Sequence, residues 1–417
     1  MMLKRRAFLA GLGASVWMGG CGRSGGGPRI VVVGGGFGGA NVARALRRYL
    51  PKARITLLER RSSFLTGPFS NAVIAGNLSS SALEVRPERL GDDGVEVRID
   101  AAVALDPERR RVRTESGARL EADYLVVSPG VRLLEEHIEG WRPEAMPAGW
   151  SGGPDVLELA RRVKALPEGA TVAIGSPPNP YRCPPGPYER ASLLAAKLAP
   201  KKGKVLILDA KDDFTKSALF RLEWDVRYPG TVEWVPRAKG GRVVRIEEDT
   251  LVTEGGERVR PDLASIIPAQ RASELAERAG LTDATGWCPV DGQTFEAKGF
   301  PGVFVLGDAA AAAPMPKSAT CAHGQAQLVA LVIAHRVRKA ELPPQMLLNT
   351  CFSLTTEQHA ISVSAAYRLE ADGPKVVNSE TSSLRADDVA REKEADQARA
   401  WLQSMLTDTF GPAAPRS

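Results

Sequence analysis

The feature that most constrains this chain is a run of glycines between a predicted strand and a predicted helix. Ile30-Val31-Val32-Val33 is an unbroken β-branched run, typical of a strand buried in a parallel sheet. Gly34, Gly36 and Gly39 follow in G-x-G-x-x-G spacing, and residues 40–50 have a helical pattern. A glycine turn in this context predicts a βαβ unit that binds a dinucleotide.

Each glycine of the turn has a physical reason. Gly34 permits the tight turn, Gly36 lets the backbone approach a pyrophosphate, and Gly39 allows the helix to pack closely on the strand. Glu59 lies 20 residues after Gly39, at the end of the next predicted strand, residues 54–59. Its carboxylate can accept hydrogen bonds from ribose hydroxyls and disfavours the 2′-phosphate of NADP.

Two later segments decide between FAD and NAD. Residues 123–130 predict a strand that runs into a glycine turn, and residues 302–309 predict a strand that ends in Gly-Asp and continues into an Ala-rich helix. Both segments resemble the later fingerprints of glutathione-reductase-like flavoproteins, in which the Gly-Asp aspartate binds the ribityl chain of FAD. We therefore expect FAD. The predicted cofactor-binding residues are Gly34, Gly36, Phe37, Gly38, Gly39, Glu59, Arg60, Asn71, Pro129, Gly130, Gly307, Asp308 and Lys317.

A second strand–turn–helix unit begins at residues 171–175. Residues 176–187 are rich in proline where a nicotinamide-binding domain carries glycines, and proline lacks the N–H that would bind a pyrophosphate. The sequence therefore predicts a domain related to NAD-binding domains that has lost the nicotinamide. Asp209, at the ribose-acid position of this unit, is expected to be a relic or a cap.

Together these patterns predict an α/β fold with two Rossmann-like dinucleotide-binding domains and a small α+β C-terminal interface domain. A long helix is expected to end near Lys339, and a second over residues 391–410 places Trp401, Leu402 and Met405 on one face, for core packing or for contact with a partner. The predicted boundaries are a signal and linker at 1–29, an FAD-binding domain at 30–136 and 278–345, a second domain at 137–277 and the interface domain at 346–417.

The N-terminus is interpreted as a targeting segment. Lys4-Arg5-Arg6 opens a twin-arginine pattern, and the apolar run that follows, to about Met18, is too short to span a bilayer. A disordered basic tail is the alternative. Residues 18–21 also resemble a lipoprotein cleavage box, which makes Cys21 a candidate lipid anchor. The expected location is the periplasm, with no membrane span.

The net charge gives little support for a nucleic-acid partner. Of the formal charge of +6, five positive charges precede residue 31, which leaves about +1 for the rest of the chain. Binding to nucleic acid needs a basic stripe on the folded body. We therefore expect no nucleic-acid role.

The remaining cysteines are Cys183, Cys288, Cys321 and Cys351. None lies in a CxxC or CxxCH motif, so the sequence predicts no haem c attachment, no iron–sulfur cluster and no metal site. The four allow three complete disulfide pairings, among which the spacing does not choose. Cys183 lies in the proline loop, where a redox role competes with that of a buried structural thiol. Glu189, six residues later, is either a general base or a carboxylate favoured at a helix start.

Several motifs make the chain resemble the flavoprotein subunit of flavocytochrome c sulfide dehydrogenase. The resemblance runs from Val31 to Gly411. Its motifs are GGGFGGA at 34–40, SNAVIAG at 70–76, YRCPPGPYERAS at 181–192, GWCPVDGQTFE at 286–296, MPKSA at 315–319 and NTCFSL at 349–354.

The resemblance implies a mechanism. Cys183 and Cys351 would form a disulfide beside the flavin, sulfide would attack it, and electrons would pass through FAD to a c-type cytochrome on a separate subunit. Glu189 would be the acid–base carboxylate, and Lys317 would place positive charge near the flavin pyrimidine. Cys288 and Cys321 receive no role and are expected to be buried thiols.

One position departs from the family. Members often bind FAD covalently through a cysteine three residues before the Ser-Asn pair, and here that position is Gly67. We therefore expect FAD to be bound without a covalent bond.

Two other functions remain as alternatives. A sulfide:quinone oxidoreductase-like enzyme would need an amphipathic C-terminal stretch with exposed aromatics, which the charged residues 385–399 fit poorly. A non-catalytic FAD electron-transfer subunit would not need both Cys183 and Cys351.

Overall fold

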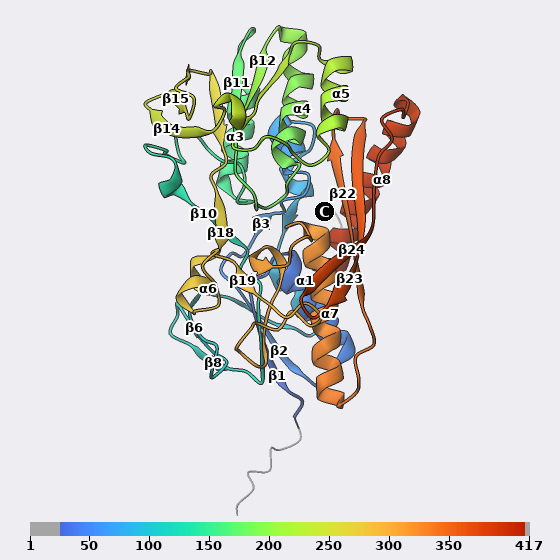
Figure 1. Cartoon of the computed structure of the whole chain (residues 1–417). Coiled ribbons are helices and arrows are strands. Elements are labelled where there is room, and N and C mark those ends of the chain that lie inside the picture. The colour runs from blue at the N-terminus through green and yellow to red at the C-terminus, as the bar shows by residue number, and fades with distance from the viewer. Residues whose placement is uncertain (1–25, 413–417) are drawn as a thin grey trace, which may run out of the picture.

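The computed structural model describes residues 26–412, and these form the predicted α/β fold. A lower domain carries the glycine turn, an upper domain carries the proline loop, and a C-terminal sheet runs along one side of both (Figure 1). The fold class expected from the sequence is confirmed.

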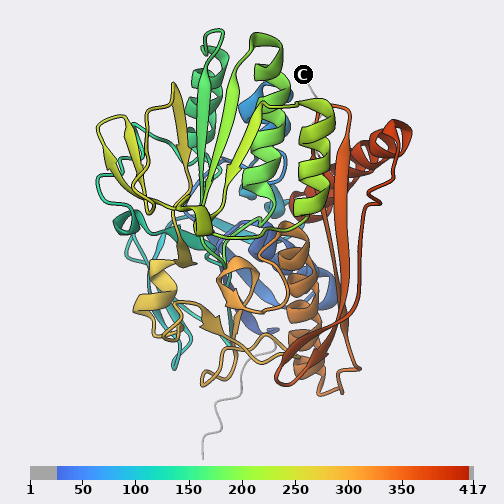
Figure 2. The ribbon, with the colours of Figure 1, turned by 45° about the horizontal axis from the view of Figure 1, so that its top comes forward.

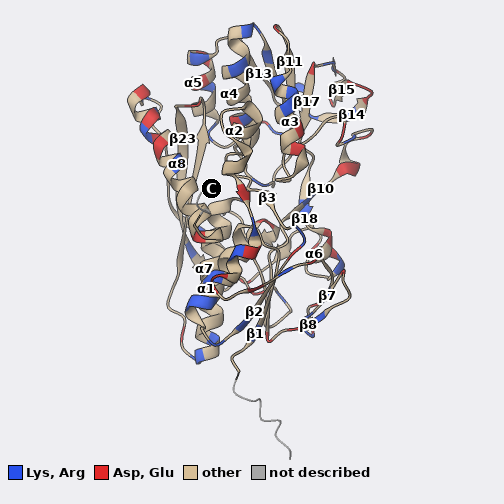
Figure 3. Cartoon of the chain, turned by 180° about the vertical axis from the view of Figure 1, so that it is seen from behind, with Lys and Arg blue, Asp and Glu red and all other residues tan. Residues whose placement is uncertain are grey.

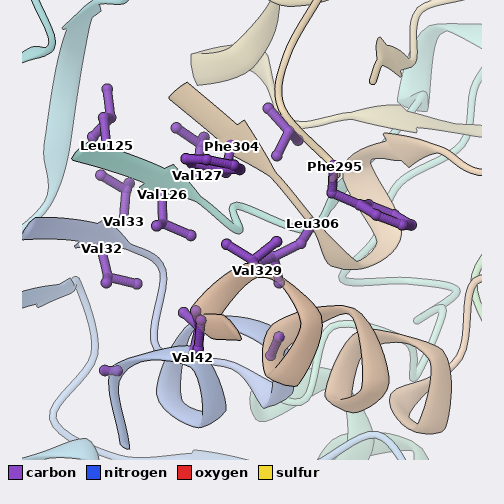
Figure 4. Close-up of a cluster of buried hydrophobic side chains, with 14 of the residues drawn as sticks. Val32, Val33, Val42, Leu125, Val126, Val127, Phe295, Phe304, Leu306 and Val329 are labelled. Atoms are coloured by element: carbon purple, nitrogen blue, oxygen red, sulfur yellow. The ribbon is translucent and has the colours of Figure 1, made fainter. Parts of the chain in front are cut away.

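The first domain is built on a parallel sheet whose strands come from both ends of the chain. In sheet order these are β20 (Val303–Val305), β9 (Tyr124–Val127), β1 (Arg29–Val33), β2 (Arg54–Glu59) and β5 (Glu96–Ile99). Helices α1 (Phe37–Tyr49) and α7 (Ala319–Arg338) pack against each other. Val42 of α1 and Val329 of α7 meet strand residues such as Val32 in one buried core (Figure 4). Apolar strands buried on both faces are the expected outcome for a parallel sheet covered by helices.

The second domain repeats this plan. Its parallel strands, in order, are β13 (Val232–Val235), β12 (Lys204–Asp209), β11 (Thr171–Ser176) and β17 (Leu263–Ile266). Its helices are α3 (Pro154–Lys164), α4 (Gly186–Leu198) and α5 (Ser217–Arg227). The two domains are joined by the antiparallel pair of β10 (Val131–Leu133) and β18 (Gln270–Ala272). Figure 2 shows the green strands and helices of this domain with the top of the molecule tilted towards the viewer.

The C-terminal unit is an antiparallel sheet of β22 (Met346–Leu354), β23 (Ala360–Glu370) and β24 (Gly373–Thr381), followed by α8 (Asp388–Phe410). Strand β22 packs against α7 of the first domain and α4 of the second. On α8, Leu402 and Met405 are buried, and Trp401 lies 6.1 Å from Phe352, measured between ring centroids. The apolar face predicted for this helix therefore packs inside the protein.

Shorter elements complete the described chain. They are α2 (Ser70–Ala75), α6 (Glu274–Arg278), the pair β3 (Phe64–Leu65) and β4 (Glu84–Val85), the sheet of β6 (Ala102–Asp106), β7 (Arg111–Thr114) and β8 (Arg119–Glu121), the sheet of β14 (Val243–Glu247), β15 (Thr250–Thr253) and β16 (Arg258–Val259), and the pair β19 (Cys288–Pro289) and β21 (Ala310–Ala311).

The Ala-rich helix predicted directly after Gly307-Asp308 is wrong. Residues 310–311 form β21, which pairs in parallel with β19, and the helix begins only at Ala319. Pro314 and Pro316 explain the difference, because the residue before a proline is disfavoured in the helical region and proline itself donates no hydrogen bond. Ser318 then caps α7 by accepting a hydrogen bond from the backbone N–H of Cys321.

The twin-arginine segment and Cys21 lie outside the described residues. Over residues 26–412, every helix is too short or too polar to cross a bilayer. Lys and Arg positions alternate with Asp and Glu positions along the ribbon in the view of Figure 3.

Candidate functional site

The glycine turn leaves an open approach to the N-terminus of α1. Gly34 has a φ of +97°, and an added Cβ there would lie 2.2 Å from the carbonyl oxygen of Ser128. A Cβ on Gly39 would lie 1.7 Å from the carbonyl oxygen of Gly34, whereas one on Gly36 would meet nothing within 4 Å. The turn is therefore closed on the side of the sheet and open at Gly36, where a pyrophosphate needs room.

The rest of the turn also suits FAD. Buried Glu59 accepts a hydrogen bond from the backbone N–H of Gly35 at 2.7 Å, which leaves further lone pairs for ribose hydroxyls. No side chain caps the N-terminus of α1, so its amides and dipole remain for a phosphate group. These residues fit the cofactor, and Glu59 with the open turn would hold its adenosine diphosphate part.

The ends of β9 and β20 form the next part of this wall. Gly130 and Gly307 both have positive φ values, of +68° and +74°. Asp308 does not stand free, because Arg182 of the proline loop forms an ion pair with it, at 2.6 Å between Nε and Oδ2. Lys317 donates to the carbonyl oxygens of Asp308 and Ala310, and burial lowers its pKa to about 8. Asp308 and Lys317 would hold the flavin end of FAD.

The other predicted cofactor residues divide into two groups. Phe37 opens α1 and packs its ring 5.4 Å from that of Phe410, Arg60 is exposed after β2, and Gly38 and Pro129 line the turn and the end of β9. Asn71, on α2, lies beside Glu189.

Asn71 contacts the predicted acid–base carboxylate. Its Nδ2 donates to Oε2 of Glu189 at 2.7 Å and to the carbonyl oxygen of Gly186 at 3.0 Å. Its Oδ1 accepts from Nε of Arg190 at 3.0 Å. The structure therefore places Asn71 as a partner of Glu189, a role that the sequence did not predict.

Cys183 of the second domain and Cys351 of the C-terminal sheet lie near enough for the charge of Cys351 to act on Cys183. Cys183 lies in the loop between β11 and α4 with a φ of +56°, and its backbone N–H donates to the carbonyl oxygen of Lys317 at 2.8 Å. Cys351 lies on β22, and both are partly buried free thiols in the structure. Burial raises the pKa of each thiol, and negative charge on Cys351 raises the pKa of Cys183 further. Cys288 and Cys321 are buried.

Glu189 completes this group from the first turn of α4. Oε1 accepts a hydrogen bond from the backbone N–H of Leu354 at 2.8 Å, and Oε2 accepts the one from Asn71. Burial raises the pKa of Glu189, while both hydrogen bonds oppose that rise. Such a carboxyl is poised to exchange a proton nearer neutral pH than an exposed one.

Two buried cations of the site, Arg190 and Lys216, were not predicted from the sequence. Arg190 is fully buried and donates to Asn71, to Ser265 and to the carbonyl oxygens of Ala148 and Gly149. Lys216, just before α5, donates to β22 and β23. The sequence pointed to Arg190 only through its place inside the motif at 181–192, and no sequence pattern pointed to Lys216.

The second domain has no free ribose acid at the end of β12. Asp209 is buried and accepts hydrogen bonds from Tyr188 at 2.5 Å, from Trp234 at 2.9 Å and from Lys211 at 2.7 Å. These bonds make Asp209 a structural residue, in keeping with a proline loop that lacks pyrophosphate-binding amides.

Three protein-family models match successive stretches of the chain. Residues 156–268 match the family model for the central part of the sulfide dehydrogenase [flavocytochrome c] flavoprotein chain, and residues 343–410 match the flavocytochrome c sulphide dehydrogenase flavin-binding model. Residues 28–154 match the pyridine nucleotide-disulphide oxidoreductase model.

Individual relatives include a flavocytochrome c sulfide dehydrogenase flavoprotein chain and sulfide:quinone oxidoreductases. The sulfide dehydrogenase [flavocytochrome c] flavoprotein chain of Chlorobaculum thiosulfatiphilum is 58% identical over 45 residues, which are 94% of that sequence and 11% of this chain. Mouse mitochondrial sulfide:quinone oxidoreductase is 25% identical over 324 residues, 72% of this chain and 68% of that one. The solved sulfide:quinone oxidoreductase of Aquifex aeolicus shares the fold, with a TM-score of 0.75, 21% identity and 93% of each chain covered.

Proposed function

Because the chain belongs to the family of flavocytochrome c sulfide dehydrogenase flavoprotein chains, with FAD as its cofactor, we propose that it oxidises sulfide through Cys183 and Cys351. The main support for this proposal is the placement of three side chains. Cys183, Cys351 and Glu189 come from three separate elements and lie within electrostatic reach of one another, and the backbone N–H of Cys183 donates to Lys317, which with Asp308 would hold the flavin.

The first step is a thiol–disulfide exchange. Hydrosulfide attacks one sulfur of a Cys183–Cys351 disulfide, a new S–S bond forms, and the old S–S bond breaks with its electron pair on the other sulfur. Glu189, as carboxylate, takes the proton of the new persulfide, and Asn71 and Leu354 keep its oxygens in place. FAD supplies the two-electron acceptor for the resulting thiolate.

The proposed final acceptor is a c-type cytochrome on another chain. The family's name couples its flavoprotein to a cytochrome, and the sequence has no CxxCH motif of its own. The twin-arginine pattern supports export of the folded flavoprotein to the periplasm, where such cytochromes occur.

We also propose that FAD is not covalently bound. Gly67 stands where the family often has its flavin-linked cysteine, and an added Cβ at Gly67 would meet no atom within 4 Å. Glycine at this position provides no sulfur for a thioether.

Anaerobic titration tests the function. Sulfide, thiosulfate and NADH are added separately to purified protein, and the absorbance of the flavin and of added cytochrome c is followed. We expect sulfide to bleach the flavin and cytochrome c to restore its colour. Bleaching by NADH but not by sulfide would contradict the proposal.

A quinone acceptor is the second candidate, because the mouse and Aquifex relatives are sulfide:quinone oxidoreductases. The sulfide-reduced protein is mixed with ferricytochrome c or with a water-soluble quinone. Faster reoxidation by the quinone would favour this candidate. A non-catalytic FAD electron-transfer subunit would show no bleaching of its flavin by sulfide.

A further inference from the structure

Lys216 is a buried lysine of the second domain whose side chain ends in the C-terminal sheet. Its Nζ donates to the carbonyl oxygen of Cys351 at 3.0 Å, to Oγ of Ser353 at 2.8 Å and to the carbonyl oxygen of Ile361 at 3.3 Å. The side chain is buried, and Lys216 itself has a left-handed φ of +65°. A non-glycine residue in this region is strained, and such strain persists only where the surroundings fix it.

All three ammonium protons are therefore donated, and all three acceptors are neutral oxygens. Over residues 26–412, none of the ion pairs includes Lys216, whereas the buried Lys211 is paired with Asp209 at 2.7 Å. A buried charge normally has a partner of opposite sign, because removing it from water is costly. Lys216 thus holds a positive charge that the resting site leaves without a direct counter-charge.

The groups around Lys216 show where a counter-charge can arise. Cys351 on β22, Glu189 on α4, Cys183 in the proline loop and Glu394 on α8 all raise the pKa of Lys216, against the larger effect of burial, which lowers it. Glu189 already accepts bonds from Asn71 and from Leu354 N–H. The two cysteines are the groups whose charge changes when a disulfide between them opens.

We propose that Lys216 is a positioning residue whose buried ammonium stabilises the negative charge that develops on the sulfur of Cys351 when the Cys183–Cys351 disulfide opens. Fixed charge of this kind acts without reorganisation at the moment of reaction. Hydrosulfide then forms its new bond to the sulfur of Cys183, and the pair of electrons from the broken S–S bond remains on Cys351. This inference rests on the proposed function for the identity of the attacking sulfide.

The test measures the pH dependence of Cys351 alkylation and does not require sulfide. In the FAD-bound protein with Cys183→Ser, the rate of Cys351 alkylation by iodoacetamide is followed over a pH series, with peptide mass spectrometry to locate the label. Lys216→Met should raise the pH midpoint of alkylation by about one unit or more, a slowing of about tenfold below that midpoint. Lys216→Arg, which keeps the charge, should return the midpoint towards that of the Lys216 protein.

Lys197→Met is the matched control, because Lys197 also donates to a neutral carbonyl, that of Ala75 at 2.8 Å, on a helix that does not carry the cysteines. It should leave the midpoint unchanged. Should Lys216→Met not accumulate as FAD-bound protein, Lys216→Gln, which keeps donors but not the charge, is tested by the same criterion.

An unchanged midpoint in folded Lys216→Met or Lys216→Gln would overturn the inference, as would an equal shift in Lys197→Met. Failure of sulfide to bleach the wild-type flavin would instead refute the proposed function and leave the alkylation result standing.

Discussion

Replacing Asn71 by Ala tests the environment of Glu189 in a way that can be worked out from the structure. The side-chain amide of Asn71 donates to Oε2 of Glu189 at 2.7 Å, and this bond opposes the rise in the pKa of Glu189 that burial causes. A hydrogen bond to a charged group contributes about 1.5–3 kcal/mol, and one pKa unit corresponds to about 1.4 kcal/mol. Losing the bond should therefore raise the pKa of Glu189 by about 1–2 units.

The assay is the pH dependence of flavin bleaching by sulfide in a stopped-flow instrument. Glu189 acts as carboxylate, so the rate falls as pH drops through its pKa, and Asn71→Ala should move this acid limb to higher pH by about 1–2 units. Asn77→Ala is the control, because Asn77 makes the same type of bond, to Glu357 at 3.2 Å, on the surface. An acid limb that stays in place in folded Asn71→Ala would refute the role given to Glu189.

Glu189 also predicts how stability depends on pH. Because folding raises its pKa, this carboxyl favours the folded state below its unfolded pKa and loses that contribution as pH rises through the folded pKa. Glu189→Gln should therefore gain stability relative to the wild type as pH increases across this window. Denaturant unfolding at several pH values measures the free energy of unfolding of both proteins. A wild type that gains stability relative to Glu189→Gln as pH rises would contradict the sign.

Three further predictions concern packing and the cofactor. In Gly186→Ala the new Cβ would lie 2.5 Å from the ring of Trp150 and 3.1 Å from Sγ of Cys183. We therefore expect the unfolding free energy to fall by about 1–3 kcal/mol and sulfide to bleach the flavin more slowly. The control Gly67→Ala should behave as wild type in both assays. Arg190→Met leaves several buried oxygens without their donor, each at a cost of about 1–3 kcal/mol, and should lower the unfolding free energy by several times the cost of a surface substitution, which denaturant titration measures. Acid precipitation should leave the flavin in the supernatant, and yellow colour in the pellet would show a covalent bond.

The sequence predicted the parts of the molecule that local patterns encode. The glycine turn, its strand and its helix needed only residues 30–59, and the proline loop at Cys183 predicted the absence of a nicotinamide fingerprint. The predicted Ala-rich helix does not form, because Pro314 and Pro316 exclude helix just where the alanines end.

The side-chain contacts of the site could not be predicted in the same way. Lys216 and Cys351 are separated by 135 residues, and Asn71 and Glu189 by 118. No periodicity in a single sequence links such positions, since they meet only after two domains and the C-terminal sheet have packed together. From the sequence alone, a buried lysine bonded to neutral oxygens cannot be distinguished from an ordinary lysine on the surface.

The central claim is that Cys183 and Cys351 form one redox pair, and peptide mapping without reductant tests it most directly. Oxidised protein is alkylated, digested and analysed before and after anaerobic treatment with one equivalent of sulfide. We expect a cross-linked peptide that joins Cys183 to Cys351 and disappears on treatment, with a persulfide on Cys183. Recovery of both cysteines as alkylated free thiols from protein that sulfide still bleaches would contradict it.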